Sequence, residues 1–320
     1  MRLIQRTHGC DLSSSSRDFL AIEGLVLSDL RAIIDRAERL LPAAVGDAPP
    51  EERLRGRVIA NLFFEDSTRT RVSFEIAAKR LGADVVNLGA SGSSTSKGES
   101  LVDSARNIEA MGVDAMVVRT SIAGGAALVA KHVACPVINA GDGRHEHPTQ
   151  AILDMLALRL RLGDLTGKRV AIVGDIANSR VARSSTHALV ALGAHVVAVG
   201  PPSLLPMGFE HLARGAGSIT IAHDFDAIIG EMDAIMMLRV QLERAAGSGV
   251  APDYRATYGL TEARRKRMRT GAPILHPGPV NRGVEIDGEV AEDSNDSLIM
   301  AQVSCGVAAR MAVLLRALNQ

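Results

Sequence analysis

Hydroxyl and cationic side chains gather just after the first strongly apolar segment of the chain. That segment ends at Phe64, and Ser67, Thr68, Arg69 and Thr70 then open a stretch with helical spacing of apolar residues. Hydroxyls, free backbone N–H groups and an arginine at the first turn of a helix can together bind an anion such as phosphate. Serine and threonine also cap helices without binding a ligand, so a plain helix cap is the alternative interpretation.

Three further arginines follow short apolar segments. Arg119, Arg180 and Arg239 each stand at or shortly after the end of such a segment. A guanidinium group can bind a carboxylate or a phosphate through two parallel hydrogen bonds. A single arginine at the end of a strand is ordinarily solvated, so a binding role depends on several of them meeting in one place.

The segment GDGRHEHPTQ carries an imidazole and an amide close together. His147 comes directly before Pro148, and Gln150 follows three residues after His147. Proline is favoured at the first position of a helix, so His147 is expected at a rigid helix start, where it could donate to an oxygen that gains negative charge. His145, Glu146 and His147 could instead bind a metal ion, but no further ligand at zinc-like spacing is near them.

The composition disfavours several classes of protein. The 320 residues include 36 basic and 36 acidic side chains, so the broad positive field of a non-specific nucleic-acid binder is missing. Aromatic residues make up 2%, and no run approaches the ~20 apolar residues of a membrane span. The three cysteines are far apart, and the first residues, MRLIQRTHGC, lack an apolar secretion segment. We therefore expect a cytoplasmic protein without nucleic-acid or membrane partners.

Apolar bursts alternate with amphipathic stretches of helical period, which is typical of βαβ units in a parallel sheet. The bursts form two sets of four, so we expect an α/β fold with two domains, each with a central parallel sheet flanked by helices. The first set is 57–64, 84–88, 114–118 and 136–139, and the second set is 169–173, 195–199, 218–221 and 234–237.

The length favours two domains, each with its own apolar core. Between the two sets of bursts runs HPTQAILDMLALRLRLGDL, and we place the domain junction there. This predicts a first domain at 1–150 and a second domain at 151–294. Apolar residues in 295–320 recur at spacings typical of a helix with one apolar stripe. We expect that helix to return across the junction and complete the first domain, so that helices join the two domains.

Seven blocks of the sequence resemble the aspartate and ornithine carbamoyltransferase family, above all its aspartate branch. They are FFEDSTRTRVSFE, KGESLVDSARN, VVR, NAGDGRHEHPTQ, VGDIANSRVARS, MMLRVQLER and ILHPGPVNRGVEI. One such block would be weak evidence, whereas seven in the right order are specific. The resemblance implies an active site in the cleft between two α/β domains, shared across the subunits of a homotrimer. It also implies transfer of the carbamoyl group of carbamoyl phosphate to the amine of L-aspartate.

The resemblance matches most of the polar residues above to carbamoyl phosphate. Catalytic roles fall to Arg69, Thr70, Arg119 and His147. The complete matched set is Ser67, Thr68, Arg69, Thr70, Ser94, Arg119, His147, Gln150, Gly278 and Pro279. In the family, the matching histidine donates to the carbonyl oxygen, and the glutamine and the carbonyls of the HPGP turn accept from the carbamoyl NH2 group.

A second set of residues is matched to L-aspartate, namely Lys97, Arg180, Arg239 and Gln241. Two arginines can each hold one carboxylate. Lys97 lies in GASGSSTSKGES, which in the family reaches the active site of the neighbouring subunit. The row of serines leaves open whether Ser93 or Ser94 makes the matching contact.

The HPGP turn distinguishes the branches of the family. The ornithine branch typically has a cysteine-containing HCLP sequence there, so ornithine is disfavoured as the acceptor. Thr120, Asn178 and Leu242 depart from residues that are frequent in the family. None of the three is a matched ligand contact, and they leave the affinity for aspartate open. An inactive homologue acting as a scaffold is an alternative, which the completeness of the matched site disfavours.

The implied reaction needs no metal and no organic cofactor. The attacking group is the amine of the substrate, and the leaving phosphate can take its proton. The turn VGDIANS could suggest a dinucleotide site, but it lacks the G-x-G-x-x-G spacing. The sequence does not decide whether a regulatory chain or a dihydroorotase joins the trimer.

Overall fold

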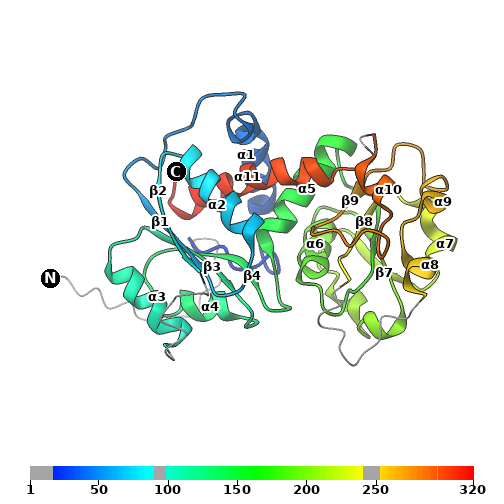
Figure 1. The fold of residues 1–320 in the computed structure, drawn as a ribbon, viewed down its shortest axis with the longest axis horizontal. Helices are drawn as coiled ribbons and strands as arrows, with labels where there is room; N and C mark the ends of the chain where they lie inside the picture. Colours follow the sequence, from blue (N-terminus) through cyan, green and yellow to red (C-terminus); the bar gives the residue numbers. More distant parts are fainter. Residues whose placement is uncertain (1–16, 90–98, 241–252, 294) are drawn as a thin grey trace.

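The computed structural model describes residues 17–89, 99–240, 253–293 and 295–320. Two lobes lie side by side in Figure 1, each built around one sheet of parallel strands with helices packed on it. This confirms the predicted α/β fold. Three residues predicted at the site, Ser94, Lys97 and Gln241, lie outside the described residues.

The sheet of the first lobe has four parallel strands in the order β2-β1-β3-β4. The strands are β1 (Val58–Phe63), β2 (Asp84–Gly89), β3 (Ala115–Thr120) and β4 (Val137–Asp142). The helices of this lobe are α1 (Leu27–Val45), α2 (Thr68–Arg80), α3 (Leu101–Ala110) and α4 (Gly125–Ala130). Both faces of β1, β3 and β4 are largely buried, which explains why they are continuous apolar runs in the sequence.

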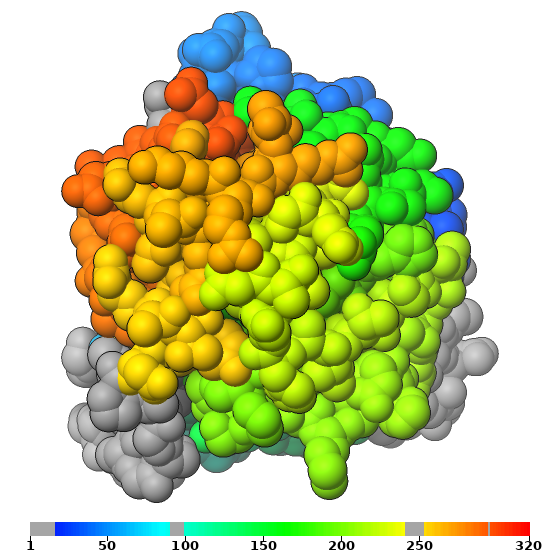
Figure 2. Space-filling view, turned by 90° about the vertical axis from the view of Figure 1, so that its right-hand side faces the viewer, coloured from blue at the N-terminus to red at the C-terminus, as the bar shows by residue number. Residues whose placement is uncertain are grey.

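The sheet of the second lobe has five parallel strands in the order β7-β6-β5-β8-β9. They are β5 (Arg169–Val173), β6 (His195–Val199), β7 (Ser218–Ala222), β8 (Ala234–Met237) and β9 (Ile274–Leu275). Only four strands were expected here, because the two residues of β9 are too few to show a period. The helices are α6 (Arg180–Ala191), α7 (Phe225–Ile228), α8 (Tyr254–Tyr258), α9 (Glu262–Arg265) and α10 (Gly288–Glu292), with short 3-10 turns at Pro202–Leu204, Phe209–Leu212 and Ile229–Glu231. Figure 2 shows the outer face of this lobe. Segments coloured from green through yellow to orange together form this face.

Two long helices, α5 (Pro148–Leu162) and α11 (Ile299–Ala317), join the lobes (Figure 1). α11 packs against α1, α2 and α5, while α5 also packs against α6. The largest apolar cluster therefore runs through both lobes, from Ile59 in β1 to Ile172 in β5, instead of dividing into one core for each. The boundary predicted after residue 150 falls within α5, which serves both lobes.

The prediction of a single apolar stripe on the last helix is wrong for the second half of α11. Residues 308–315 are all buried, so this part of the helix has no solvent face. Of the described residues, only α11 forms a helix long and apolar enough to cross a membrane, yet 67% of its most apolar 18-residue stretch is buried inside the protein. A helix that is apolar all round can be a core helix, and the packing of α1, α2 and α5 around α11 fits that role.

Candidate active site

The carboxyl ends of strands from both sheets meet at one cavity of about 850 Å³. Its walls come from the segments that follow β1, β4, β5, β8 and β9, from the end of β3, and from α11. Every predicted site residue within the described part of the chain lines this cavity: Ser67, Thr68, Arg69, Thr70, Arg119, His147, Gln150, Arg180, Arg239, Gly278 and Pro279. Segments far apart in the sequence thus build a single site.

Strand order explains why four arginines converge. In the first sheet β1 lies between β2 and β3, and Arg69 follows β1 while Arg119 is near the end of β3. In the second sheet β5 lies between β6 and β8, and Arg180 and Arg239 follow β5 and β8. Open α/β sheets bind ligands at such points, because the connections from neighbouring strands leave in opposite directions and open a crevice.

The first turn of α2 brings hydroxyl groups and one guanidinium group to the cavity wall. Ser67 occupies the cap position but makes no capping hydrogen bond with its side chain, so the plain-cap interpretation is wrong. Arg69 packs on the HPGP turn, where a Cβ on Gly278 would lie 2.9 Å from the guanidinium carbon and φ is +62°. Burial and the nearby charge of Arg239 lower the pKa of Arg69. An anionic ligand would reduce the repulsion between cations held this close together.

Glu65 connects arginines of the two lobes. Its carboxylate accepts hydrogen bonds from both terminal nitrogens of Arg180, at 2.9 and 3.1 Å, and lies 3.7 Å from Arg119 Nη2. Arg180 also donates to the carbonyl of Gly143 at 3.2 Å, and Arg119 donates to that of Ala140 at 3.0 Å. These bonds hold both guanidinium groups in fixed directions before any ligand binds. Glu65 was not predicted as a site residue, although it lies in the first matched block.

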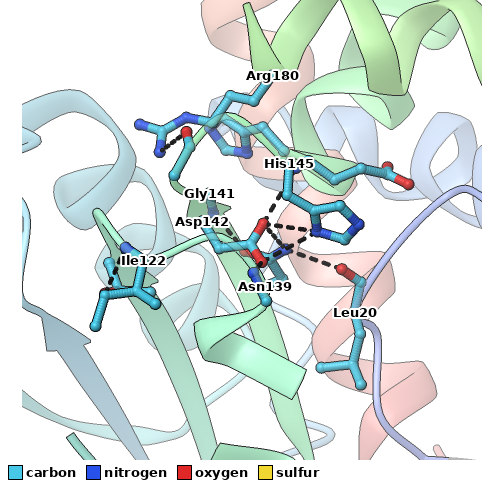
Figure 3. A network of polar contacts seen from close by, with 12 residues as sticks. Leu20, Ile122, Asn139, Gly141, Asp142, His145 and Arg180 are labelled. Atoms are coloured by element: carbon cyan, nitrogen blue, oxygen red, sulfur yellow. Dashed lines mark hydrogen bonds and ion pairs between the residues drawn. The ribbon is translucent and has the colours of Figure 1, made fainter. Parts of the chain in front are cut away.

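A buried carboxylate, Asp142, organises the loop that supplies these carbonyls. Asp142 accepts a hydrogen bond from the Asn139 side chain at 2.8 Å, and its oxygens lie 3.1 and 3.2 Å from His145 Nδ1 (Figure 3). The hydrogen bond with Asp142 raises the pKa of His145. Gly141 has a φ of +116°, and a Cβ there would approach the two guanidinium groups just described to 3.1 Å. Only glycine allows the loop to lie this close to them.

His147 is held at the start of α5, directly before Pro148, as predicted. Its side chain is buried in the cavity wall, and its backbone N–H donates to Ser184 Oγ at 2.8 Å. Burial, reinforced by the charges of three arginines, lowers the pKa of His147 well below its usual range. The imidazole is therefore neutral and can donate one N–H to an oxygen without acting as an acid.

Some polar residues of the cavity wall are not evident from the sequence. Arg310 on α11 is 4% exposed, donates to Ser73 Oγ at 3.0 Å and lies over the ring of Phe74. Burial lowers its pKa to about 10. In the sequence, Arg310 stands out only as a single arginine within AARMAVLL, and the spacing of apolar residues does not predict a role for it. His276 and Gln302 also line the cavity and were not predicted.

The side chains of residues 145–147 separate, so they do not form the alternative metal site. His145 lies against Asp142, and His147 lines the cavity. Glu146 accepts hydrogen bonds from the backbone N–H groups of residues 22 and 23, at 2.8 and 2.9 Å.

One group among the described residues has the composition of a metal site, away from the cavity. Glu23, Glu146 and His187 each offer one ligand atom within 4.8 Å of the others. Hydrogen bonds already engage Glu146, from the backbone and from Ser184 Oγ at 2.8 Å. None of the three residues lines the cavity, so this group takes no part in binding there.

Two family models match the chain one after the other. The aspartate/ornithine carbamoyltransferase carbamoyl-P binding domain matches residues 17–160, and the Asp/Orn binding domain of the same family matches residues 166–317. Among curated proteins, the aspartate carbamoyltransferase catalytic subunit of Myxococcus xanthus is 53% identical over 300 residues, which cover 93% of this chain and 98% of the relative.

Solved structures of both branches share the fold. Aspartate transcarbamoylase from Trypanosoma cruzi in complex with N-(phosphonacetyl)-L-aspartic acid superposes with a TM-score of 0.85 at 29% identity, covering 95% of this chain and 96% of the other. Ornithine carbamoyltransferase from Pyrococcus furiosus superposes with a TM-score of 0.84 at 28% identity, covering 95% and 98%.

Proposed function

The chain belongs to the aspartate/ornithine carbamoyltransferase family, and we propose that it transfers the carbamoyl group of carbamoyl phosphate to the amine of L-aspartate. The products are N-carbamoyl-L-aspartate and phosphate, a step of de novo pyrimidine biosynthesis. One observation carries the proposal: arginines from the carboxyl edges of both sheets converge on a single cavity. The similarity to named aspartate carbamoyltransferases supports aspartate as the acceptor.

Electrostatics explains why so many cations are needed. A phosphate and two carboxylates repel one another strongly in a site shielded from water, so fixed positive charges must hold them in contact. Arg69 at the start of α2 and Arg119 in β3 serve the phosphate end. Arg180 and Arg239 face them from the other sheet and serve the carboxylates.

The chemical step needs no nucleophile from the protein. The amine nitrogen of aspartate attacks the carbamoyl carbon and forms the new C–N bond, while the bond from that carbon to the phosphate oxygen breaks. Negative charge grows on the carbonyl oxygen during the attack, and the neutral His147 and the cation of Arg119 stabilise it. The departing phosphate takes the proton that the amine loses.

A product assay with three acceptors tests the proposal. The purified chain is incubated with carbamoyl phosphate and with L-aspartate, L-ornithine or N-acetyl-L-ornithine, and phosphate and the carbamoylated product are measured. We expect turnover with aspartate alone. Turnover with ornithine instead would overturn the assigned acceptor, and no turnover with any of them would support the inactive scaffold.

Replacing Arg69 tests the assignment of the phosphate end. We expect Arg69→Ala to lower kcat/KM for carbamoyl phosphate by far more than tenfold, which is about 1.4 kcal/mol of transition-state stabilisation. Arg55→Ala is the control, because the Arg55 side chain is 82% exposed and forms an ion pair with Glu52 on the surface. A loss below tenfold in the first variant, or equal losses in both, would contradict the role of Arg69.

We further propose a cytoplasmic homotrimer whose subunits share active sites, because the sequence around Lys97 resembles a family segment that reaches the active site of the neighbouring subunit. The test mixes Arg69→Ala chains with Lys97→Ala chains under conditions in which subunits exchange. Hybrid trimers with one site intact in both residues should regain activity that neither parent has. No regain would mean that each chain completes its own site. The sequence leaves open whether a regulatory chain or a dihydroorotase binds the trimer, and the mass of the assembly from cell extract would decide between these states.

A further inference from the structure

We infer that Asp154 is a positioning residue that fixes the acceptor groups for the carbamoyl NH2 and thereby lets the site distinguish a carbamoyl group from an acyl group of the same shape. The inference rests on the proposed function and adds to it a determinant of substrate choice. Asp154 lies on α5, is fully buried, and does not itself line the cavity.

The first step concerns the orientation of Gln150. Its Nε2 donates to Asp154 Oδ1 at 2.8 Å, and Gln150 lines the cavity. An amide side chain has a donor end and an acceptor end of almost equal shape, whereas an ionised carboxylate only accepts. Asp154 therefore captures the donor end of the amide. The acceptor oxygen is left to face other partners, which is the orientation that an incoming NH2 group requires.

The second step extends the same control to the HPGP turn. Gln302 on α11 also donates its Nε2 to Asp154 Oδ1, at 2.7 Å, so its own oxygen is free to accept the backbone N–H of His276 at 3.0 Å. The backbone N–H of Gly278 donates to His276 Nδ1 at 2.8 Å. In a trans peptide the C=O points opposite to the N–H, so the Pro277 carbonyl is directed away from His276. Both kinds of NH2 acceptor are thus connected to one carboxylate.

The surroundings of Asp154 show what its charge contributes. Ser185 Oγ donates to the second oxygen, Oδ2, at 3.0 Å, and the cation of Arg310 on α11 acts on the carboxylate through space. Burying a carboxylate is unfavourable unless donors surround it, and an apolar side chain would fill the same space at less cost. What an apolar residue would not provide is an acceptor that sets the direction of two amides.

Acetyl phosphate is the probe that isolates this effect. It has a methyl group where carbamoyl phosphate has NH2, so it makes the same phosphate and carbonyl contacts but leaves the fixed acceptors unpaired. A site built to accept hydrogen bonds rejects an analogue that lacks the donor. The informative quantity is the selectivity ratio: the Ki of acetyl phosphate as a competitive inhibitor, divided by the Kd of carbamoyl phosphate.

The experiment compares two substitutions of Asp154 in the full chain. Asp154→Leu removes the acceptor, so the side-chain amides of Gln150 and Gln302 can rotate by 180°. The selectivity ratio should then fall by about tenfold, which corresponds to the free energy of roughly one hydrogen bond. Asp154→Asn should keep most of the ratio, because its oxygen can still accept both amides while its NH2 donates to Ser185. Rescue by asparagine separates positioning from simple loss of packing.

Two further variants keep the test decisive if Asp154→Leu does not fold. Gln302→Met breaks the connection to the HPGP turn and should also lower the selectivity ratio. Ser185→Ala removes a donor from Oδ2 and leaves Gln150 and Gln302 untouched, so it should retain the ratio. An unchanged ratio in the folded variants, or an equal fall in Ser185→Ala, would overturn the inference while turnover stands. No turnover by the unsubstituted chain would overturn the proposed function and the inference with it.

Discussion

At the scale of single residues, His147 combines burial with the role of hydrogen-bond donor. Its pKa is held well below the ordinary value of 6.5, because charging the ring is disfavoured first by burial and then by three arginines. We expect its 15N NMR signals to show a neutral ring over the pH range in which exposed histidines take up a proton. We also expect His147→Ala to lower kcat on the order of a hundredfold, as for the loss of one oxyanion donor. Titration of this ring near pH 6.5 would contradict the assignment.

The buried carboxylate of Asp154 makes a different prediction, about stability. Burial raises its pKa from 3.8 to about 6. The folded chain therefore holds this proton more tightly than the unfolded chain, and the resulting stabilisation is complete only below the ordinary pKa value of 3.8 and is lost as the pH rises through about 6. Asparagine has no proton to lose. The free energy of unfolding of Asp154→Asn, minus that of the unsubstituted chain, should rise by about 2 kcal/mol between pH 4 and 7.5. Urea denaturation of both chains at both pH values measures this difference in the free energy of unfolding. A difference that stays constant with pH would rule out the raised pKa of Asp154.

At the scale of elements, α11 offers a direct test of close packing. Ala312 is fully buried on this helix, which packs against α1, α2 and α5, whereas Ala301 is exposed on the same helix. Ala312→Leu should lower the free energy of unfolding by about 1–3 kcal/mol, because extra methyl groups have no space there. Ala301→Leu, the matched control, should stay within about 0.5 kcal/mol. Equal effects of the two changes in chemical denaturation would disprove the described packing of α11.

The same elements show what the sequence could and could not predict. The bursts at 169–173, 195–199 and 234–237 coincide end to end with β5, β6 and β8, because buried parallel strands are continuous apolar runs. Arg119 and Thr120 belong to β3 although the apolar run stops before them, since tertiary contacts bury the polar end of that strand.

The cavity was predictable where side chains follow strands and was missed where partners are distant. Arg69, Arg180 and Arg239 stand after apolar runs, so the sheet edge brings them together. Asp154 and Gln302 are 148 residues apart, and no local pattern reports their hydrogen bond. Arg310 was missed for the same reason.

At the scale of the whole molecule, the cavity has walls from both lobes, and ligands should draw them together. Arg69 of α2 already lies against the turn after β9, so the lobes approach closely at this edge. We expect N-(phosphonacetyl)-L-aspartate, which carries both ends of the proposed substrates, to reduce the radius of gyration in X-ray scattering. Phosphate alone fills only the phosphate end of the cavity and should change the radius of gyration less. Identical profiles with and without the analogue would argue against closure.

The position of α11 also bears on how the chain is made. Domains generally fold as units, in the order in which they leave the ribosome. Here the strands β1–β4 emerge early, but the helix that covers α1, α2 and α5 is translated only after the entire second sheet. The first half therefore lacks the cover of α11 until the chain is released from the ribosome, and its apolar surface is open to chaperones and proteases until then. A chain that ended before α11 would lack the helix that packs on α1, α2 and α5, and with it the cavity-lining side chains of Gln302 and Arg310.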